Sequence, residues 1–343
     1  SLGLVGSEMC IRDRVCRGAT CPTASLAPAD PGDSLGGAER LRGAAGGNGN
    51  SVGWLGPACG RARSDGAGAP RTPHWSCAIL GQRLLRPMSA ALTATYLGAN
   101  GWLLEFGGLR VVVDPWFTGP LSFGPMNWLL KGELATPQPV PAGMDLLLLS
   151  QGLPDHCHPP SLALLPKDLL VVASPTAARK AQQLGFTRIT PLRPGEQHDH
   201  GSLTITATAG AAVPQIENGW LLDHPAGSLY LEPHGFPSPD LPIRRLTAVI
   251  TPVIDVGLPL AGAFVRGRSA LPELLERFQP AAVLASTTGG DVRFSGLLAS
   301  ALQVEGSPEE AAAVVARAEG CRFIDPVPGQ PYGLDPVQTG SSR

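Results

Sequence analysis

The chain lacks several features that would assign it to a common functional class. Its 343 residues contain no Cys-x-x-Cys pair, so the spacing of a zinc ribbon or a redox dithiol is missing. No apolar run of about 18 residues precedes Met88, so no transmembrane segment is predicted there. Lys and Arg do not cluster and the net charge is −2, which gives no reason to expect nucleic acid or an anionic membrane as a partner.

Cysteine is unevenly distributed. Five of the seven cysteines precede residue 90, which leaves Cys157 and Cys321 in the part of the chain with folding patterns. A secreted domain would more often use paired cysteines, so this distribution favours a reducing compartment for the folded part.

The first ninety residues differ in composition from the rest. They hold ten Arg, no Lys and six acids, and show no sustained period of 2 or 3.6. We expect residues 1–90 to be a disordered leader, because they offer too little apolar surface to offset chain entropy. Residues 1–14 resemble translated sequencing adapter, 15–87 form a candidate transit peptide, and Met88 is an alternative start. A domain is expected over 91–335, followed by a disordered tail over 336–343.

Hydrophobic patterns in the domain predict an α/β protein. Asn100-Gly101 between two apolar runs is a strong hairpin signal. Thr176 and Ser307 are the expected helix caps. The expected strands are 93–97, 102–106, 109–113, 146–149, 169–173, 187–192, 203–209, 220–222, 228–231, 246–252, 281–285 and 323–325. The expected helices are 161–165, 175–184, 271–278 and 307–318.

The stretch from Met144 to Pro160 organises the chain. Leu146 to Leu149 is a continuous apolar run, as expected for a strand covered on both faces. Asp155, His156 and His158 then follow within four positions, on a loop that leads into a helix. Loops at the carboxyl ends of such strands are where α/β proteins usually place their chemistry.

This stretch resembles the signature loop of the metallo-β-lactamase superfamily, Ser/Thr-His-x-His-x-Asp-His. Ser150 matches the first position, and Asp155 and His156 match the last two, while Gln151 and Leu153 stand where the pattern has histidines. Further matches are Asp114-Pro115 and the segment 232–235. The loop is most similar to that of divergent metallo-hydrolase-like proteins of plants and cyanobacteria. The resemblance implies a four-layer αββα sandwich and a chloroplast location; without a plastid, a cytoplasmic location is expected.

The same resemblance implies a degenerate metal motif. In the superfamily, His and Asp at loop ends hold zinc or iron. The histidines expected near 210–214 and 286–288 are absent here. A rearranged site for a single Zn ion remains, with His156, His158, Glu232 and His234 as metal ligands. Asp155 and His156 are the candidate catalytic pair, and Asp155 is a further candidate ligand.

Two functions are consistent with these residues. The first is metal-dependent hydrolysis of a small ester, lactone or phosphodiester. The alternative is a catalytically inactive binding or scaffold protein that kept the fold, bound no metal and retained Asp155-His156 as a structural pair. Without metal, that pair could also serve as a general acid/base dyad. Cys157 is read as a core residue, the aromatic loop 116–131 as either core or the lining of a substrate groove, and His198-x-His200 as a solvated turn.

Overall fold

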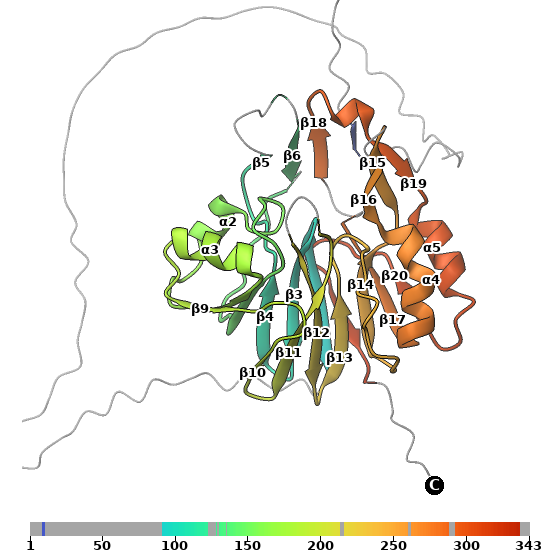
Figure 1. Ribbon diagram of the computed structural model, residues 1–343, viewed down its shortest axis with the longest axis horizontal. Helices are drawn as coiled ribbons and strands as arrows, with labels where there is room; N and C mark the ends of the chain where they lie inside the picture. Colours follow the sequence, from blue (N-terminus) through green and yellow to red (C-terminus); the bar gives the residue numbers. More distant parts are fainter. Residues whose placement is uncertain are drawn as a thin grey trace, which may run out of the picture. The chain divides into compact units, whose positions relative to one another are not determined.

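The computed structural model describes residues 91–122, 128, 130–134, 136–212, 216–259, 262–287 and 292–336, together with Met9–Cys10 (Figure 1). Of the predicted leader, residues 1–90, the described residues include only Met9–Cys10. The predicted tail lies outside them from residue 337 onward. The transit-peptide prediction concerns this outside part and stays a prediction.

The first of two seven-stranded sheets contains the predicted opening hairpins. Its strand order is β21-β2-β3-β4-β7-β8-β9. The antiparallel strands are β21 (Pro331–Leu334), β2 (Leu92–Gly98), β3 (Gly101–Phe106) and β4 (Leu109–Val113). β7 (Leu146–Leu149), β8 (Leu170–Ala173) and β9 (Arg188–Pro191) continue the sheet in parallel with β4. The hairpin at Asn100-Gly101 is confirmed.

The second sheet has the order β10-β11-β12-β13-β14-β17-β20. Its antiparallel half comprises β10 (Gln197–His200), β11 (Leu203–Ala209), β12 (Asn218–His224) and β13 (Gly227–Leu231). Its parallel half adds β14 (Ala248–Pro252), β17 (Ala282–Ser286) and β20 (Arg322–Ile324). His198 and His200 therefore lie on a strand, which corrects the prediction of a turn.

The two sheets pack face to face, and helices cover both outer faces (Figure 1). Trp102 and Leu148 of the first sheet share one buried cluster with Trp220 and Ile250 of the second. α2 (Pro159–Ala163) and α3 (Pro175–Gln183) cover the first sheet, whereas α4 (Gly267–Phe278) and α5 (Pro308–Val315) cover the second. The predicted αββα sandwich is confirmed.

The apolar run of β7 is explained by this layering. Leu146 and Leu148 point into the cluster between the sheets, whereas Leu147 and Leu149 pack under the helices. Successive side chains of a strand alternate between its faces, so a strand covered on both sides needs an unbroken apolar run.

Several short elements were not predicted. One small sheet joins β15 (Asp255–Leu258) to β16 (Gly262–Arg266) and β19 (Gln303–Glu305). Another has the order β1-β18-β6-β5, from Met9–Cys10, Val292–Ser295, Lys131–Leu134 and Leu121–Ser122. A 3-10 turn, η2, spans Ala299–Ala301. These strands have two to five residues and pair with segments distant in the chain, which no local pattern indicates.

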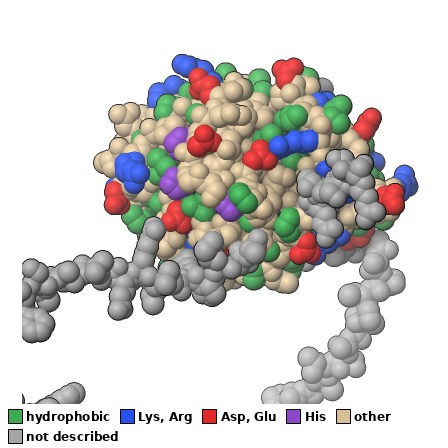
Figure 2. All heavy atoms as spheres, turned by 90° about the horizontal axis from the view of Figure 1, so that it is seen from below, with side chains coloured by type: hydrophobic (Ala, Val, Ile, Leu, Met, Phe, Trp, Pro, Cys, Tyr) green, Lys and Arg blue, Asp and Glu red, His purple; other side chains and the backbone are tan. Residues whose placement is uncertain are grey.

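The cap of α3 and the starts of α2 and α4 differ from expectation, and α2 begins at Pro159 instead of residue 161. Ser174, not Thr176, caps α3, since its Oγ accepts from the amide of Ala177 at 3.3 Å. α4 begins at Gly267, so Pro272 lies inside the helix instead of in its first turn. The described helices include none that is long and apolar enough to cross a membrane. On the face shown in Figure 2, acidic and basic side chains are interspersed.

Candidate metal centre

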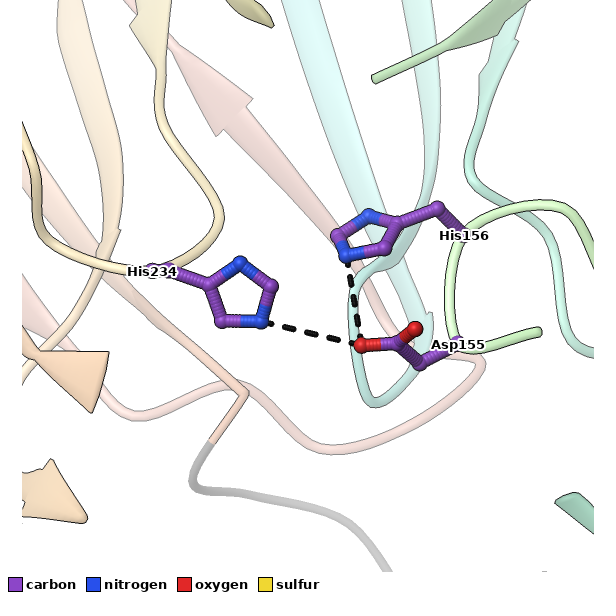
Figure 3. A group of neighbouring side chains, drawn as sticks. All are labelled: Asp155, His156 and His234. Atoms are coloured by element: carbon purple, nitrogen blue, oxygen red, sulfur yellow. Dashed lines mark ion pairs between the residues drawn. The ribbon is translucent and has the colours of Figure 1, made fainter. Parts of the chain in front are cut away.

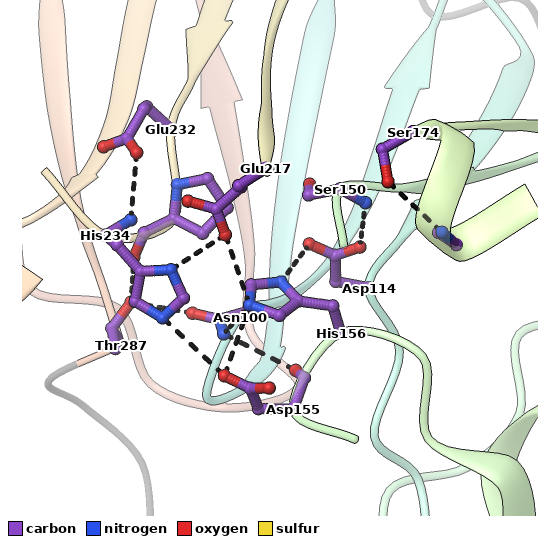
Figure 4. A network of polar contacts seen from close by, with 12 residues as sticks. Asn100, Asp114, Ser150, Asp155, His156, Ser174, Glu217, Glu232, His234 and Thr287 are labelled. Carbon is purple, nitrogen blue, oxygen red and sulfur yellow. Dashed lines mark hydrogen bonds and ion pairs between the residues drawn. The ribbon is translucent and has the colours of Figure 1, made fainter. Parts of the chain in front are cut away.

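One edge of the sandwich collects polar side chains from five loops (Figure 4). Asp155 and His156 follow β7, and His234 follows β13. Glu217 directly precedes β12, and the β2–β3 turn and the end of β17 bring in further residues, Asn100 and Thr287. The loops after β7, β13 and β17 reach this edge because the parallel strands of each sheet end there, and the antiparallel strands β3 and β12 begin at the same edge.

Asp114 holds the signature loop through contacts with Ser150 and His156. It ends β4 with a left-handed φ of 39°, and its side chain is fully buried. Its Oδ1 accepts the amide of Ser150 at 2.8 Å, and its Oδ2 lies 2.9 Å from Nδ1 of His156. Burial raises the pKa of Asp114 even though His156 opposes the shift. A carboxylate at Nδ1 sets the ring orientation of His156 and directs Nε2 toward the loop edge.

Three ligand atoms meet at this edge (Figure 3). Oδ2 of Asp155 lies 3.2 Å from Nε2 of His156 and 3.6 Å from Nε2 of His234. All three atoms lie within 4.8 Å of one another. Ligands about 2.0–2.2 Å from a tetrahedral ion are separated by about 3.3–3.6 Å, so the spacing suits a single zinc-sized ion.

The charges of this cluster reinforce one another. Burial alone would lower the pKa of His156, but Asp155 and Asp114 raise it well above its usual value. Burial likewise opposes protonation of His234, yet Glu217 and Asp155 raise its pKa to about 10. Burial would raise the pKa of Asp155, and the two histidines lower it instead. In the absence of a metal, protons therefore supply the positive charge that these carboxylates require.

The donor set fits a metal ion. Among the described residues, Oδ1 of Asp155 and Oε2 of Glu217 are buried without a hydrogen-bond partner. Buried carboxylate oxygens without partners are costly unless a cation compensates them. Imidazole and carboxylate together suit zinc, iron and manganese. The structure thus supports a candidate metal site at Asp155, His156 and His234, without selecting among these metals.

Two of the four predicted ligands stand apart from the cluster. Both ring nitrogens of His158 have other neighbours, Ser161 Oγ at 2.9 Å and the carbonyl of Pro120 at 3.2 Å. The prediction for His158 is wrong because the loop turns: the amides of His156 and Cys157 both donate to the carbonyl of Leu153. His158 points toward Trp116 instead.

The side chain of Glu232 accepts hydrogen bonds from the backbone of the loop that follows it. Its carboxylate accepts the amide of His234 at 3.3 Å, that of Phe236 at 2.8 Å, and that of Gly235. Burial and the neighbouring Glu217 raise its pKa to about 8. Of the four predicted ligands, the structure therefore brings together His156 and His234, while Glu232 shapes the loop that carries His234.

Glu217 is a site residue that the sequence reasoning missed. It is fully buried, and its Oε1 lies 2.8 Å from Nδ1 of His234 and 3.3 Å from Nε2 of His156. The signal available was the loop 210–217, where a histidine was expected near 210–214. Glu217 lies just after that segment, and its carboxylate contacts both histidines.

Most of the remaining candidates belong to the core, but Trp128 of the aromatic loop is 63% exposed. Cys157 is fully buried and burial raises its pKa to about 12, so its thiol is neutral and inert near neutral pH. Trp116 and Phe117 of the aromatic loop are also buried. Residues 123–127 of that loop lie outside the described residues.

The sandwich and the metal-suited cluster at its edge define a metallo-β-lactamase fold of the hydrolase-like kind. The chain belongs to the β-lactamase superfamily domain family, whose sequence profile matches residues 93–286, more than half of the chain. Comparison with curated protein sequences gives no match.

Solved structures share the fold. Isothiocyanate hydrolase from Delia radicum gut bacteria is 16% identical with a TM-score of 0.51, covering 71% of this chain and 99% of that protein. A protein from Veillonella parvula, described as a possible metal-dependent hydrolase, is 12% identical with a TM-score of 0.54, covering 72% and 100%. At these identities the likeness concerns the fold alone.

Proposed function

We propose that this protein is a metal-dependent hydrolase whose single ion is held by Asp155, His156 and His234. The observation that carries the proposal is the convergence of three ligand atoms from two separate loops, with Oδ2 of Asp155 lying 3.2 Å and 3.6 Å from Nε2 of the two histidines. Gln151 and Leu153 stand where the superfamily pattern has histidines, so the proposal is limited to one ion.

When bound, such an ion supplies a Lewis acid and lowers the pKa of a coordinated water. The protein's own groups complete the site. Oδ1 of Asp155 has no partner among the described residues, so it can accept a proton from a nucleophilic water. The Asn100 amide lies 3.4 Å from Nε2 of His156, and Thr287 fixes it by donating to its Oδ1 at 2.8 Å. Its N–H can therefore stabilise negative charge on a substrate oxygen.

The proposed substrates are small esters, lactones or phosphodiesters, each of which develops such an oxyanion on hydrolysis. The alternative is a binding or scaffold protein without activity. One observation favours it: His156 is enclosed by Asp114, Asp155 and Glu217, so a protonated imidazole satisfies these carboxylates without any metal.

Metal analysis separates the two proposals. Protein from zinc-, iron- and manganese-supplemented cultures should carry about one ion per chain, lost in His156→Ala and in His234→Ala. It should also hydrolyse an aryl ester, a lactone or an aryl phosphodiester, whereas the control His200→Ala should behave like wild type. Less than about a tenth of an equivalent of metal, unaffected by His156→Ala, would leave the scaffold proposal standing.

The plant and cyanobacterial kinship and the chloroplast location also remain proposals. The kinship rests on the loop from Gln151 to His158, and the location rests on that loop and on the composition of the leader. Import of a fluorescent protein fused behind residues 15–87 into isolated chloroplasts would support the location. A fusion that stays outside the organelle would contradict it.

A further inference from the structure

The carboxylate of Glu217 faces both histidines of the candidate metal centre (Figure 4). Oε1 lies 2.8 Å from Nδ1 of His234, and Oε2 is buried without a hydrogen-bond partner among the described residues. Removing a carboxylate from water is costly unless the site compensates its charge. A buried glutamate in this position therefore indicates a specific role.

The backbone holds Glu217 in place from three directions. Its amide donates to the carbonyl of Ala211 at 2.8 Å, and its carbonyl accepts from Gly210 at 3.1 Å. The amide of Asn218 donates to the carbonyl of Ser150 at 3.0 Å, which ties this segment to the end of β7. Glu217 is thus fixed relative to the loop that carries Asp155 and His156.

Gly210 leaves the space that the carboxylate occupies. A Cβ at this position would stand 3.3 Å from Cγ and from Oε2 of Glu217, closer than most real contacts. The segment from 210 to 214 is also where the superfamily resemblance leads us to expect a histidine. Glu217 lies at the other end of this segment, directly before β12.

The two histidines are held in matching ways. Nδ1 of His156 lies 2.9 Å from Asp114, and Nδ1 of His234 lies 2.8 Å from Glu217. Each ring then presents Nε2 toward Oδ2 of Asp155. A carboxylate that accepts the Nδ1 proton selects the tautomer with its lone pair on Nε2, and it makes that nitrogen a better ligand.

We propose that Glu217 is a positioning residue that holds His234 as an Nε2 metal ligand. In this role it orients the ring of His234, and its Oε1 also lies 3.3 Å from Nε2 of His156. This inference rests on the proposed metal site, and it adds a residue to which no sequence motif pointed.

Zinc affinity, measured by chelator competition on the full chain, tests the role. Glu217→Ala should bind zinc about 10–100 times more weakly than wild type, whereas Glu217→Gln, which keeps an oxygen acceptor for Nδ1–H, should lose less than about tenfold. The control Glu276→Gln removes an exposed carboxylate on α4 and should bind like wild type.

A spectroscopic readout accompanies the affinities. In zinc-loaded protein labelled with ¹⁵N-histidine, the Nδ1 proton of His234, assigned by its loss in His234→Gln, should exchange slowly in wild type and in Glu217→Gln. It should disappear in Glu217→Ala. Equal losses of zinc affinity in the Gln and Ala variants, or wild-type affinity in a folded Ala variant, would overturn the positioning role.

The outcome stays separable from that of the proposed function. If wild type binds no zinc, the metal site fails, and the Nδ1 proton of the metal-free protein alone decides whether Glu217 holds the ring. If Glu217→Ala does not fold, a loss of more than about tenfold in Glu217→Gln overturns the proposal.

Discussion

Asp114→Asn should disable His156 without disturbing the backbone. Asparagine tolerates the left-handed φ of 39° about as well as aspartate, so the substitution isolates the side chain. Its amide oxygen can still accept the Ser150 amide, but its NH₂ group now faces Nδ1 of His156. The neutral ring must then accept at Nδ1 and carry its proton on Nε2, the atom turned toward the metal.

The structure sets the expected magnitude. A buried hydrogen bond to a charged group contributes about 1.5–3 kcal/mol, and the amide retains part of that. We expect the free energy of unfolding to decrease by about 2 kcal/mol, which lowers the melting temperature by about 4–8 °C in a domain of this size. Zinc affinity should fall about 10–100-fold, as is usual when the partner of a ligating histidine is removed.

Differential scanning calorimetry and chelator competition measure the two effects. Asp240→Asn, which removes an exposed carboxylate, is the matched control and should change neither. Wild-type zinc affinity in a folded Asp114→Asn variant would refute the reasoning, because His156 would then not depend on its carboxylate for the correct tautomer.

Three other predictions concern metal, pH and packing. Zinc at about 100 times its dissociation constant should stabilise the chelator-treated protein by about 2.7 kcal/mol, visible as a higher melting temperature; a melt that ignores zinc would contradict this. The pKa of His234 in the folded protein, about 10, exceeds the ordinary 6.5, so the stability it contributes is fully present below pH 6.5 and is lost toward pH 10. The raised pKa of Glu232, about 8, lowers stability in the same direction between pH 4.5 and 8. The melting temperature of the metal-free protein should therefore decrease as pH rises, and it should decrease less steeply in His234→Gln. Leu148→Ala should cost about 2–5 kcal/mol in chemical unfolding, whereas the half-exposed Leu164 should tolerate alanine with little loss.

Local patterns were sufficient for most of the sandwich. The apolar run of β7, the Asn100-Gly101 turn and the alternation of β11 each follow from the period of a strand or the backbone of a turn, so their positions could be read directly. The cap of α3 was harder to predict because Ser174 and Thr176 are both residue types that cap helices. Only Ser174 accepts the capping hydrogen bond. The short strands of the small sheets depend on neighbours distant in the chain, which no local pattern encodes.

The sequence by itself determined that Asp155 and His156 lie on a loop after a buried strand, since apolar runs and loop residues are local properties. The sequence did not determine whether His158 joins them. The backbone turns at Leu153, and the His158 side chain contacts Ser161 instead of the cluster. The meeting of His234 and Glu217 with that loop depends on the packing of two sheets. Only tertiary structure brings together residues up to 79 positions apart, because a ligand set is defined by distance in space and not by spacing along the chain.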